Sequence, residues 1–338
     1  MRRQLFSALT TSVCFALCAA LATAWGWRQL NSPLTLPAQG LFFEVERGAP
    51  LAQVTSDLEA LGVLRYPRMV DLYAQVRGTA TGIQAGEYEF VPGLTGIGLI
   101  ETLGGGDVYL HQFTLVEGWR FADAIERLRA HPAIAATDRS SAEIMTELGK
   151  PEAHPEGQFL PDTYSFPRGT TDIELLGWAH EALWSLVDEN FEAFGASDVL
   201  RQPYDGLILA SIIEKETALD RERGLIAGVL HERLRRGMRL QTDPTVIYGL
   251  GDAFDGNLTR AQLDADTPYN TYTRRGPPPT PIALAGIASI RAAFSPIENG
   301  ALYFVATGEP DGGHVFSATL EEHNAAVQRY LARERAGP

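Results

Sequence analysis

The stretch "DGLILASIIEKETALD", residues Asp205 to Asp220, joins an unbroken apolar run to two glutamates that flank a lysine. In a helix, at about 100° per residue, Leu209 and residues 212–213 fall on one stripe, with Glu216 in the middle of it. Glu214 points to roughly the opposite side, because residues two positions apart do not share a helix face. The stretch therefore predicts a core helix that presents one carboxyl group, that of Glu216, from its apolar face.

A carboxyl group in such a place suits acid–base chemistry. Burial disfavours the charged form, so the pKa of Glu216 is expected to rise from about 4.3 towards the range in which the acid donates a proton near neutral pH. In the alternative interpretation, Glu216 lies at a fraying helix end and reaches solvent or pairs with Arg221 or Arg223. Glu214 and Lys215 are expected at a solvated helix end.

The segments after this helix carry polar and aromatic residues in loops, where ligand-binding residues are common. The candidate substrate-binding residues in these loops are Gln241, Asp243, Tyr269, Asn270 and Tyr272. Aromatic faces beside amide and carboxylate groups suit sugars, whose apolar CH faces stack while their hydroxyl groups form hydrogen bonds. Asp243 stands directly before Pro244, so a helix cap is the alternative role for it.

Composition limits the classes of protein to which the chain can belong. Its 338 residues are 45% hydrophobic and 21% charged, which indicates a globular chain with two or three domains. The formal net charge of −14 argues against a nucleic-acid partner, because phosphate binding needs a basic surface. Both cysteines, Cys14 and Cys18, lie in the N-terminal apolar stretch, so neither a disulfide framework nor a thiolate metal site is expected.

Other metal and cofactor sites are not expected either. A hypothetical metal site could be assembled from His231, His314, His323 and Asp243. The chain has no HExxH-type spacing, which argues against it, and "LGGGD" at 103–107 lacks the Lys-Ser/Thr pair of a phosphate-binding loop. The sequence thus predicts no metal and no cofactor.

The N-terminal stretch is long and uncharged. After Arg2 and Arg3 the next charged residue is Arg28, and the run between them is long enough to span a bilayer. Because the charge bias places the N-terminus in the cytoplasm, residues 1–29 are predicted to be a cytoplasmic tip and transmembrane anchor in the cell (inner) membrane, with the remainder on the periplasmic side. The alternative is a cleaved signal peptide, with a cleavage site at "ATA" (22–24).

A pattern that occurs twice follows a predicted linker at residues 30–40. The copies, offset by seventy residues, match Phe43 with Phe113, Val45 with Leu115, Gly48 with Gly118, and Leu58 with Leu128. Each copy is typical of a short strand, a glycine turn and an amphipathic helix. "GEYEFVPG" (86–93) and "DTYSFPRG" (162–169) are strand-like segments that echo each other downstream. The pattern favours a duplicated small α+β unit, and chance recurrence of strand–turn–helix units is the alternative.

The character of the sequence changes to helix at about residue 171. "TDIELLGWAHEALWSLVDENFEAF" (171–194) begins with a Thr/Asp cap and carries apolar residues at helical spacing. These patterns divide the chain into small α+β units over residues 41–110 and 111–170 and a mainly helical part over residues 171–338.

Several longer motifs resemble those of one known family. They are "ASIIEKETA", "RLRRGMRLQTDPTVIYGLG", "PYNTYTRRGPPPTPIA" and "LYFVATGEPDGGHVFSATLEEHN", with "VEGWR" and "EGQFLPDTYSF" upstream. Together they resemble the YceG-like family of membrane-anchored endolytic murein transglycosylases, and the resemblance extends from the N-terminal stretch to about Tyr330. One departure is "RRGPPPTPIA", which has arginines and an extra proline where a shorter turn is expected.

The resemblance implies a fold and a catalytic residue. It implies an α+β chain with an N-terminal transmembrane helix, a LysM-like sugar-binding module (41–110), a second α+β unit or connector (111–170) and a mainly helical, lysozyme-like catalytic domain with loop and strand insertions (171–338). The catalytic residue of the family is the second glutamate of its Glu-Lys-Glu-Thr motif. That residue matches Glu216, with Thr217 after it, in agreement with the helical stripe.

The implied reaction cleaves the β-1,4 bond between N-acetylmuramic acid and N-acetylglucosamine in peptidoglycan. Glu216 would act as acid and then as base, leaving a 1,6-anhydro end, with Gln241, Asp243 and Asn270 as candidates to stabilise charge. One alternative is a hydrolytic muramidase, which needs a second carboxylate such as Asp243. The other is a non-catalytic peptidoglycan-binding scaffold, in which Glu216 is dispensable. Expected partners are glycan strands, the membrane and peptidoglycan synthases.

Overall fold

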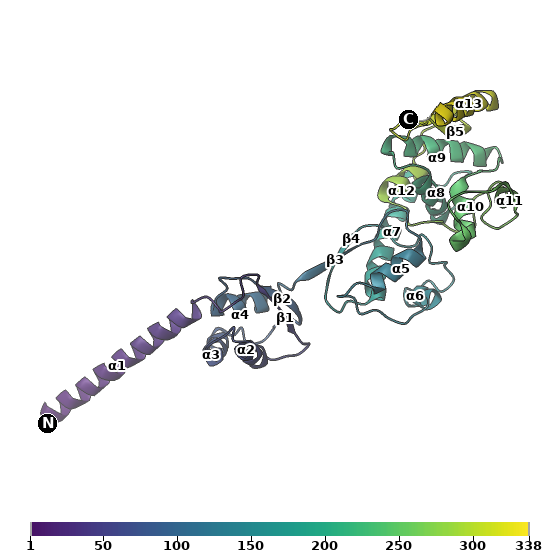
Figure 1. The fold of residues 1–338 in the computed structure, drawn as a ribbon. Helices are drawn as coiled ribbons and strands as arrows, with labels where there is room; N and C mark the ends of the chain where they lie inside the picture. Colours follow the sequence, from purple (N-terminus) through teal and green to yellow (C-terminus); the bar gives the residue numbers. More distant parts are fainter. Residues whose placement is uncertain (1, 337–338) are drawn as a thin grey trace. The chain divides into compact units, whose positions relative to one another are not determined.

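The computed structural model describes residues 2–336, with side chains from residue 12 to residue 335. The chain forms two compact units. The first comprises the residues up to His111 together with Phe166–Arg168, and the second comprises Gln112–Ser165 and the residues from Gly169 onward. Helices and small two-stranded sheets make up the chain (Figure 1), so the predicted α+β class is confirmed.

The first helix, α1 (Arg2–Leu30), takes up the N-terminal uncharged stretch. Within the residues that the structure describes, no helix combines the length and the apolar character that a membrane crossing requires. The anchor predicted over residues 1–29 includes residues 1–11, whose side chains lie outside the described part of the chain, so the anchor stays a prediction.

The first unit has a hydrophobic core of its own. Its further elements are β1 (Leu41–Val45), α2 (Leu51–Ala60), α3 (Pro67–Arg77), β2 (Gly86–Phe90) and α4 (Gly96–Gly105). β1 and β2 pair antiparallel, with Leu41 opposite Phe90. Because alternate residues of a strand share a face, Tyr88 and Phe90 point together into the core, where Phe43 of β1 stacks on Phe90.

The second copy of the repeat has the same local structure as the first. Its elements are β3 (Leu110–Thr114), α5 (Phe121–Arg129), α6 (Ser141–Glu147) and β4 (Thr163–Pro167). β3 pairs with β4, as β1 pairs with β2. Gly48 and Gly118 stand at the matching turns with φ of 82° and 78°, a conformation that glycine adopts without strain. The predicted strand, glycine turn and helix are therefore confirmed in both copies.

The rest of the second unit is mainly helical. Its elements are α7 (Asp172–Phe194), α8 (Pro203–Glu216), α9 (Asp220–Arg235), α10 (Asp243–Leu250), the 3₁₀ helix η1 (Gly251–Ala253), α11 (Arg260–Asp264), α12 (Ile287–Phe294), β5 (Tyr303–Ala306), β6 (His314–Ser317) and α13 (Leu320–Ala336). α7 begins with the expected cap, since the Thr171 hydroxyl accepts a hydrogen bond from Glu174 N and the Glu174 carboxylate accepts one from Thr171 N.

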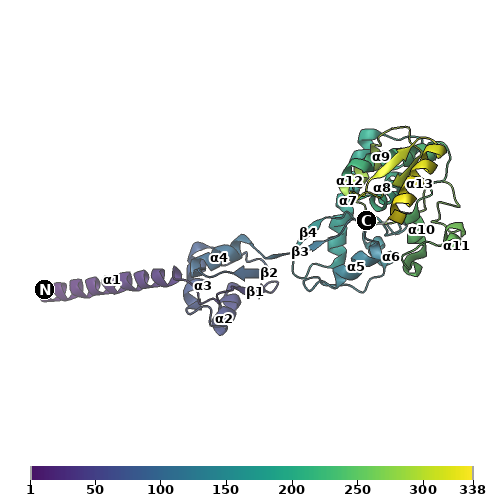
Figure 2. The same ribbon diagram turned by 45° about the horizontal axis from the view of Figure 1, so that its top comes forward.

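Helix α8 is the buried core helix that its sequence predicts. It lies among α7, α9, α10 and α12 and contacts all four (Figure 2). Every residue from Gly206 to Ile213 is buried. Gly206 permits the close approach of α12, because a Cβ at this position would lie 2.2 Å from the ring of Phe294. The burial of this helix on all sides fixes where its last residue, Glu216, projects.

The division predicted at residue 170 does not separate compact units, since residues 112–165 belong with the helical part. The buried carboxylate of Asp172, at the start of α7, accepts hydrogen bonds from Arg129 Nε at 2.7 Å and from Thr137 N at 3.0 Å. Farther along, Gly118 N donates to Leu284 O at 2.8 Å. These contacts join the second repeat copy to the helices.

Candidate active site

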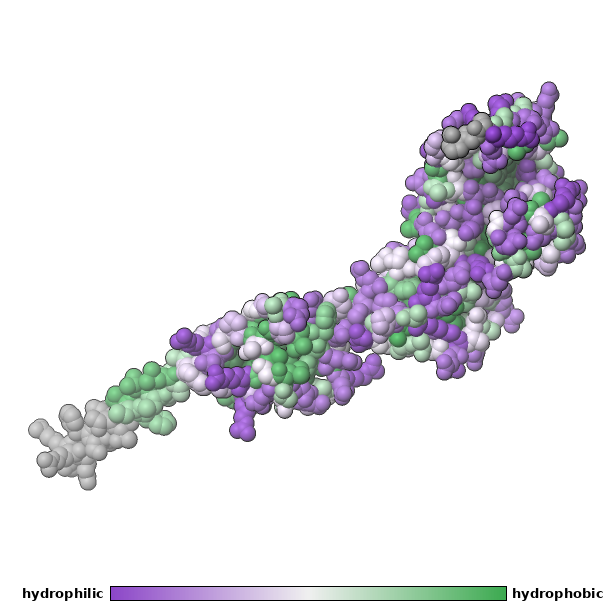
Figure 3. Space-filling view, in the orientation of Figure 1, coloured by the Kyte–Doolittle hydropathy of each residue, from purple (hydrophilic) through white to green (hydrophobic). Residues whose placement is uncertain are grey.

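Glu216, the last residue of α8, lines a cavity of about 510 Å³ in the second unit. The other lining residues come from α9, the start of α10 and the segment before it, the loop after α11, β5 and α13; they are Arg233, Leu240, Gln241, Asp243, Tyr272, Tyr303, Phe304, Val305, Leu320, His323 and Asn324. In Figure 3 the surface is hollowed between the part that carries α13 and the part that carries α10 and α11. The end of the central helix therefore faces an open cavity of ligand size.

The surroundings of the Glu216 carboxyl group favour its protonated form. Burial, and next the neighbouring Asp243 carboxylate, raise the pKa of Glu216 to about 8, against the opposing effect of the Arg233 cation. Burial also raises the pKa of Glu156, to about 7, but that residue is 4% exposed and its Oε1 accepts a hydrogen bond from Phe121 N. Glu216 thus combines a raised pKa with access to a cavity.

The alternative in which an arginine neutralises Glu216 is wrong. Arg221 forms an ion pair with Asp311, and Arg223 forms one with Asp220. Among the side chains described, those of residues 12–335, no arginine or lysine forms a salt bridge with Glu216. The proton on Glu216 is therefore not displaced by a paired cation.

Asp243 faces the same cavity as Glu216 and is not a helix cap. The N-cap residue of α10 is Thr242, and Asp243 is the first helical residue. The Tyr272 hydroxyl donates a hydrogen bond of 2.5 Å to Asp243 Oδ1. Burial, followed by this hydrogen bond, raises the pKa of Tyr272, so the phenol keeps its proton and holds the Asp243 carboxylate in place.

Arg233 places a fixed positive charge beside the cavity. Its buried guanidinium donates from Nε to Leu302 O at 2.6 Å and from Nη1 to Leu240 O at 2.6 Å, and it lies 5.2 Å from the ring centroid of Tyr303. Backbone carbonyls satisfy these donors without neutralising the charge. The cation therefore remains able to stabilise a negative charge on Glu216.

His323 has hydrogen-bonding capacity that no described protein group uses. Its ring stacks on Tyr303 with centroids 5.1 Å apart, and its Nδ1 is buried without a partner among the side chains described. Burial, and then Arg233, lower the pKa of His323, which favours the neutral imidazole. A buried nitrogen without a partner is a candidate contact for a bound ligand.

Three of the five predicted substrate-binding residues meet at the cavity, namely Gln241, Asp243 and Tyr272. Tyr269 packs against Tyr248, and its hydroxyl lies 2.9 Å from that of Thr280. The other is Asn270, which is 1% exposed, and its Nδ2 donates to Gln262 O, Leu263 O and Ala265 O. The structure therefore gives Tyr269 and Asn270 roles in holding their loop, and substrate contact by either of them stays a prediction.

Glu214 does not lie at a solvated helix end, and this prediction is wrong. Its Oε2 accepts hydrogen bonds from Gly286 N at 3.0 Å and from Ser289 Oγ at 2.7 Å, at the start of α12. Lys215 is exposed, as expected, and donates from Nζ to Gly118 O at 3.2 Å. Glu214 thus joins two helices and takes no part in the cavity.

The sequence patterns did not predict a site role for Arg233, Tyr303 or Asn324. They indicated His323 only as a candidate metal ligand. The remaining histidines of that hypothetical site lie elsewhere, with His231 against Ala293 O and His314 paired with Glu222. Within the described residues, no group of three or more His, Cys, Asp or Glu side chains could hold a metal ion. The lining of the cavity combines charged, hydrogen-bonding and aromatic side chains of the protein.

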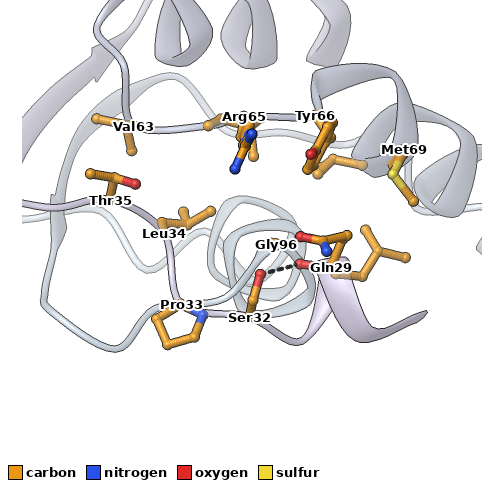
Figure 4. A pocket seen from close by; sticks show the side chains of 13 residues that line it. Gln29, Ser32, Pro33, Leu34, Thr35, Val63, Arg65, Tyr66, Met69 and Gly96 are labelled. Carbon is orange, nitrogen blue, oxygen red and sulfur yellow. Dashed lines mark hydrogen bonds between the residues drawn. The ribbon is translucent and has the colours of Figure 1, made fainter. Parts of the chain in front are cut away.

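A smaller cavity of about 200 Å³ lies in the first unit, beside the end of α1 (Figure 4). The hydroxyl of Ser32 donates to Gln29 O at 2.7 Å on one side of it, and Arg65 lies on the other side. Its lining residues include no aspartate, glutamate or histidine. It therefore lacks a carboxyl or imidazole group for proton transfer, and the cavity at Glu216 is the better candidate for an active site.

Comparison with known proteins points to one family. A model of the YceG-like family matches residues 43–329. An endolytic murein transglycosylase of Bacillus subtilis is 31% identical over 307 residues, covering 85% of this chain and 84% of that protein. An endolytic murein transglycosylase of Streptococcus pneumoniae is 25% identical, and the matched region covers 85% of this chain and 58% of that protein. A crystal structure of a putative YceG-like protein from Listeria monocytogenes is 27% identical, with a TM-score of 0.54, over 86% of this chain and 99% of that one.

Proposed function

The chain belongs to the YceG-like family, and from this premise we propose that it is an endolytic murein transglycosylase, a lyase that cleaves peptidoglycan strands between N-acetylmuramic acid and N-acetylglucosamine. The observation that carries the assignment is the position of Glu216. Its carboxyl group has a raised pKa, lies at the end of a buried helix and lines a cavity. Two relatives that match most of this chain carry the same activity in their names.

In the proposed mechanism, Glu216 acts twice. As an acid it donates its proton to the glycosidic oxygen, and the bond from that oxygen to C1 of the muramic residue breaks. As a base the Glu216 carboxylate then removes the proton from the 6-hydroxyl of the same residue, whose oxygen closes onto C1. The proton returns to Glu216, the product is a 1,6-anhydro ring, and no water is consumed.

The neighbouring charges suit both steps. Asp243 favours the protonated form of Glu216 before cleavage, and as a carboxylate it also stabilises the positive charge that develops on the sugar ring. Arg233 stabilises the glutamate anion that exists between the two steps. His323 and Gln241 line the cavity beside them and offer hydrogen-bonding groups to the sugar.

One observation favours a second candidate function, a hydrolytic muramidase. Asp243 shares the cavity with Glu216, as a second carboxylate must if it is to activate water or to attack the sugar. Its hydrogen bond from Tyr272 fixes its orientation without removing its charge. The two functions differ in their products, because hydrolysis leaves a reducing end and transglycosylation leaves an anhydro end.

Digestion of uncrosslinked glycan strands tests the endolytic assignment. The full chain is expected to shorten long strands rapidly before free disaccharides accumulate, because an endolytic enzyme cuts within the strand. Strand length is followed by chromatography over time. Disaccharide release from the start would indicate an exolytic enzyme, and strands of unchanged length would favour the non-catalytic scaffold.

We further propose that α1 anchors the chain in the cell membrane, with the active site on the periplasmic side. The support is the run without charge from Gln4 to Trp27 and the exposed apolar side chains Phe15, Leu17 and Leu21. The protein is expected in the membrane fraction with its first residues intact, as checked by fractionation and N-terminal sequencing. A mature N-terminus near Trp25 would instead identify a cleaved signal peptide.

A LysM-like role for residues 41–110 is also part of this proposal. Two helices, α2 and α3, connect the paired strands β1 and β2 in a small unit with its own core, which suits an independent sugar-binding module. Partnership with peptidoglycan synthases stays a prediction. Cosedimentation with insoluble peptidoglycan, compared between the full chain and a chain that lacks residues 41–110, tests whether these residues contribute to peptidoglycan binding.

A further inference from the structure

We propose that a second cavity, of about 640 Å³, binds the part of the glycan strand on the far side of the scissile bond from the sugar in the Glu216 cavity. This inference rests on the proposed function and assigns a second part of its binding site. The cavity is formed by side chains from the turn before α5, the end of α8, and α10 with the segment after it.

The two cavities adjoin at two points of the chain. Lys215 lines the second cavity and Glu216 the first, and in the same way Pro244 lines the second and Asp243 the first. Because consecutive Cα atoms are about 3.8 Å apart, the two cavities neighbour each other at the end of α8 and at the start of α10. Glu216 lines the first cavity at this boundary, where the bond between sugars bound in the two cavities would be cut.

The lining of the second cavity suits a sugar chain. Trp119, Tyr248 and Phe254 supply aromatic faces, on which the apolar faces of sugar rings stack. Charged groups lie among them: Arg120 forms ion pairs with Asp123 at 3.1 Å and with Asp252 at 3.3 Å. The volume lies in the range of small-molecule binding sites.

Trp119 is held firmly for such a contact. Gly118 N donates to Leu284 O at 2.8 Å, and Leu284 N donates to Trp119 O at 2.8 Å, so the turn is fixed to the segment before α12. The guanidinium of Arg127 lies 4.8 Å from the Trp119 ring centroid and fixes the ring further. Rigid aromatic groups bind with little loss of conformational entropy. The "VEGWR" motif, to which Trp119 belongs, thereby gains a binding role.

An endolytic enzyme requires such a second site. A cut in the middle of a strand leaves several sugars on both sides, and a cavity of about 510 Å³ at Glu216 has room for only a few sugar units. Binding on both sides places the scissile bond at Glu216 and disfavours cuts at strand ends. Filling the second cavity should therefore make cleavage depend on strand length.

The test compares Trp119→Ala with a matched control, Trp178→Ala, which removes an exposed tryptophan of α7 that lines neither cavity. Full-length chains are supplied with uncrosslinked glycan strands of defined lengths, and kcat/KM is measured for each length. For the wild type and Trp178→Ala, kcat/KM is expected to rise with length. Trp119→Ala should lose at least tenfold on long strands and show little dependence on length.

Further variants keep the outcome clear. Trp119→Phe, which retains an aromatic face, should recover most of the loss, and Phe254→Ala tests the same cavity if Trp119→Ala proves unstable in thermal unfolding. A wild type that cleaves strands while the Trp119 and Phe254 variants match Trp178→Ala would overturn the second site and leave the proposed function standing. A wild type that cleaves no strand would overturn the proposed function itself.

Discussion

Replacement of Glu216 by glutamine is expected to lower kcat for glycan cleavage by about three orders of magnitude or more, because glutamine neither donates nor accepts the proton that the mechanism moves. The substitution preserves size, so the fold should be unchanged. Activity on uncrosslinked strands, measured by the appearance of new strand ends, checks the loss. Turnover that survives in Glu216→Gln would remove this residue from the catalytic role.

The same variant should be more stable than the wild type at alkaline pH. The folded chain raises the pKa of Glu216 from 4.5 to about 8, so the folded state holds this proton more tightly than the unfolded state. The stabilising contribution is fully present below about pH 4.5 and is lost as the pH rises through about 8. Glutamine does not ionise, so Glu216→Gln should melt at a higher temperature than the wild type at pH 9, with little difference at pH 4.5.

The activity of the wild type should also depend on the protonation of Glu216. The acid step needs protonated Glu216, so kcat/KM is expected to fall as the pH rises through about 8. The matched control is Glu214→Gln, because the Glu214 carboxylate accepts hydrogen bonds from Gly286 N and Ser289 Oγ and so connects two helices. It should lower the melting temperature, retain much of the activity and keep the alkaline limb in place. Equal activity losses in the two variants would contradict the separation of their roles.

Helical periodicity was enough to predict that Glu216 follows a buried apolar stripe, but not which residues surround it. The stripe of Leu209, Ile212 and Ile213 depends only on the geometry of one helix, and all three residues are buried in the structure. The position of Glu214 depends on what packs against the other side of α8, and α12 comes from a distant part of the sequence. A helical wheel shows which residues share a face, but it does not show that the opposite face is also covered.

For the same reason, the sequence alone does not reveal all the residues that line the cavity. Asp243, at the start of α10, and Tyr272, in the loop after α11, stand in segments rich in polar groups, where a ligand contact is expected from composition alone. Arg233 belongs to a run of basic residues at the end of α9 and differs from its neighbours only because Leu302 and Leu240 carbonyls enclose it. Tertiary contacts, rather than local sequence, decide which of several similar side chains is buried beside the acid.

The product of cleavage should distinguish transglycosylation from hydrolysis completely. If Glu216 acts first as acid and then as base towards the sugar's own 6-hydroxyl, strands digested in oxygen-18 water should carry 1,6-anhydromuramic ends without the label. The intramolecular attack is favoured because a tethered nucleophile has a high effective molarity and needs no positioned water. Mass spectrometry of the new ends measures both features at once.

Hydrolysis is the outcome that would contradict transglycosylation, and Asp243 is the residue that could support it. A carboxylate that activates water beside Glu216 would deliver solvent oxygen to C1, and every new muramic end would then be reducing and labelled. Asp243→Asn separates the two reactions further. In a transglycosylase it should lower the rate through the loss of charge stabilisation while the ends remain anhydro and unlabelled. In a muramidase it should abolish the labelled product, so labelled ends from the wild type that disappear in Asp243→Asn would assign hydrolysis to this pair of carboxyl groups.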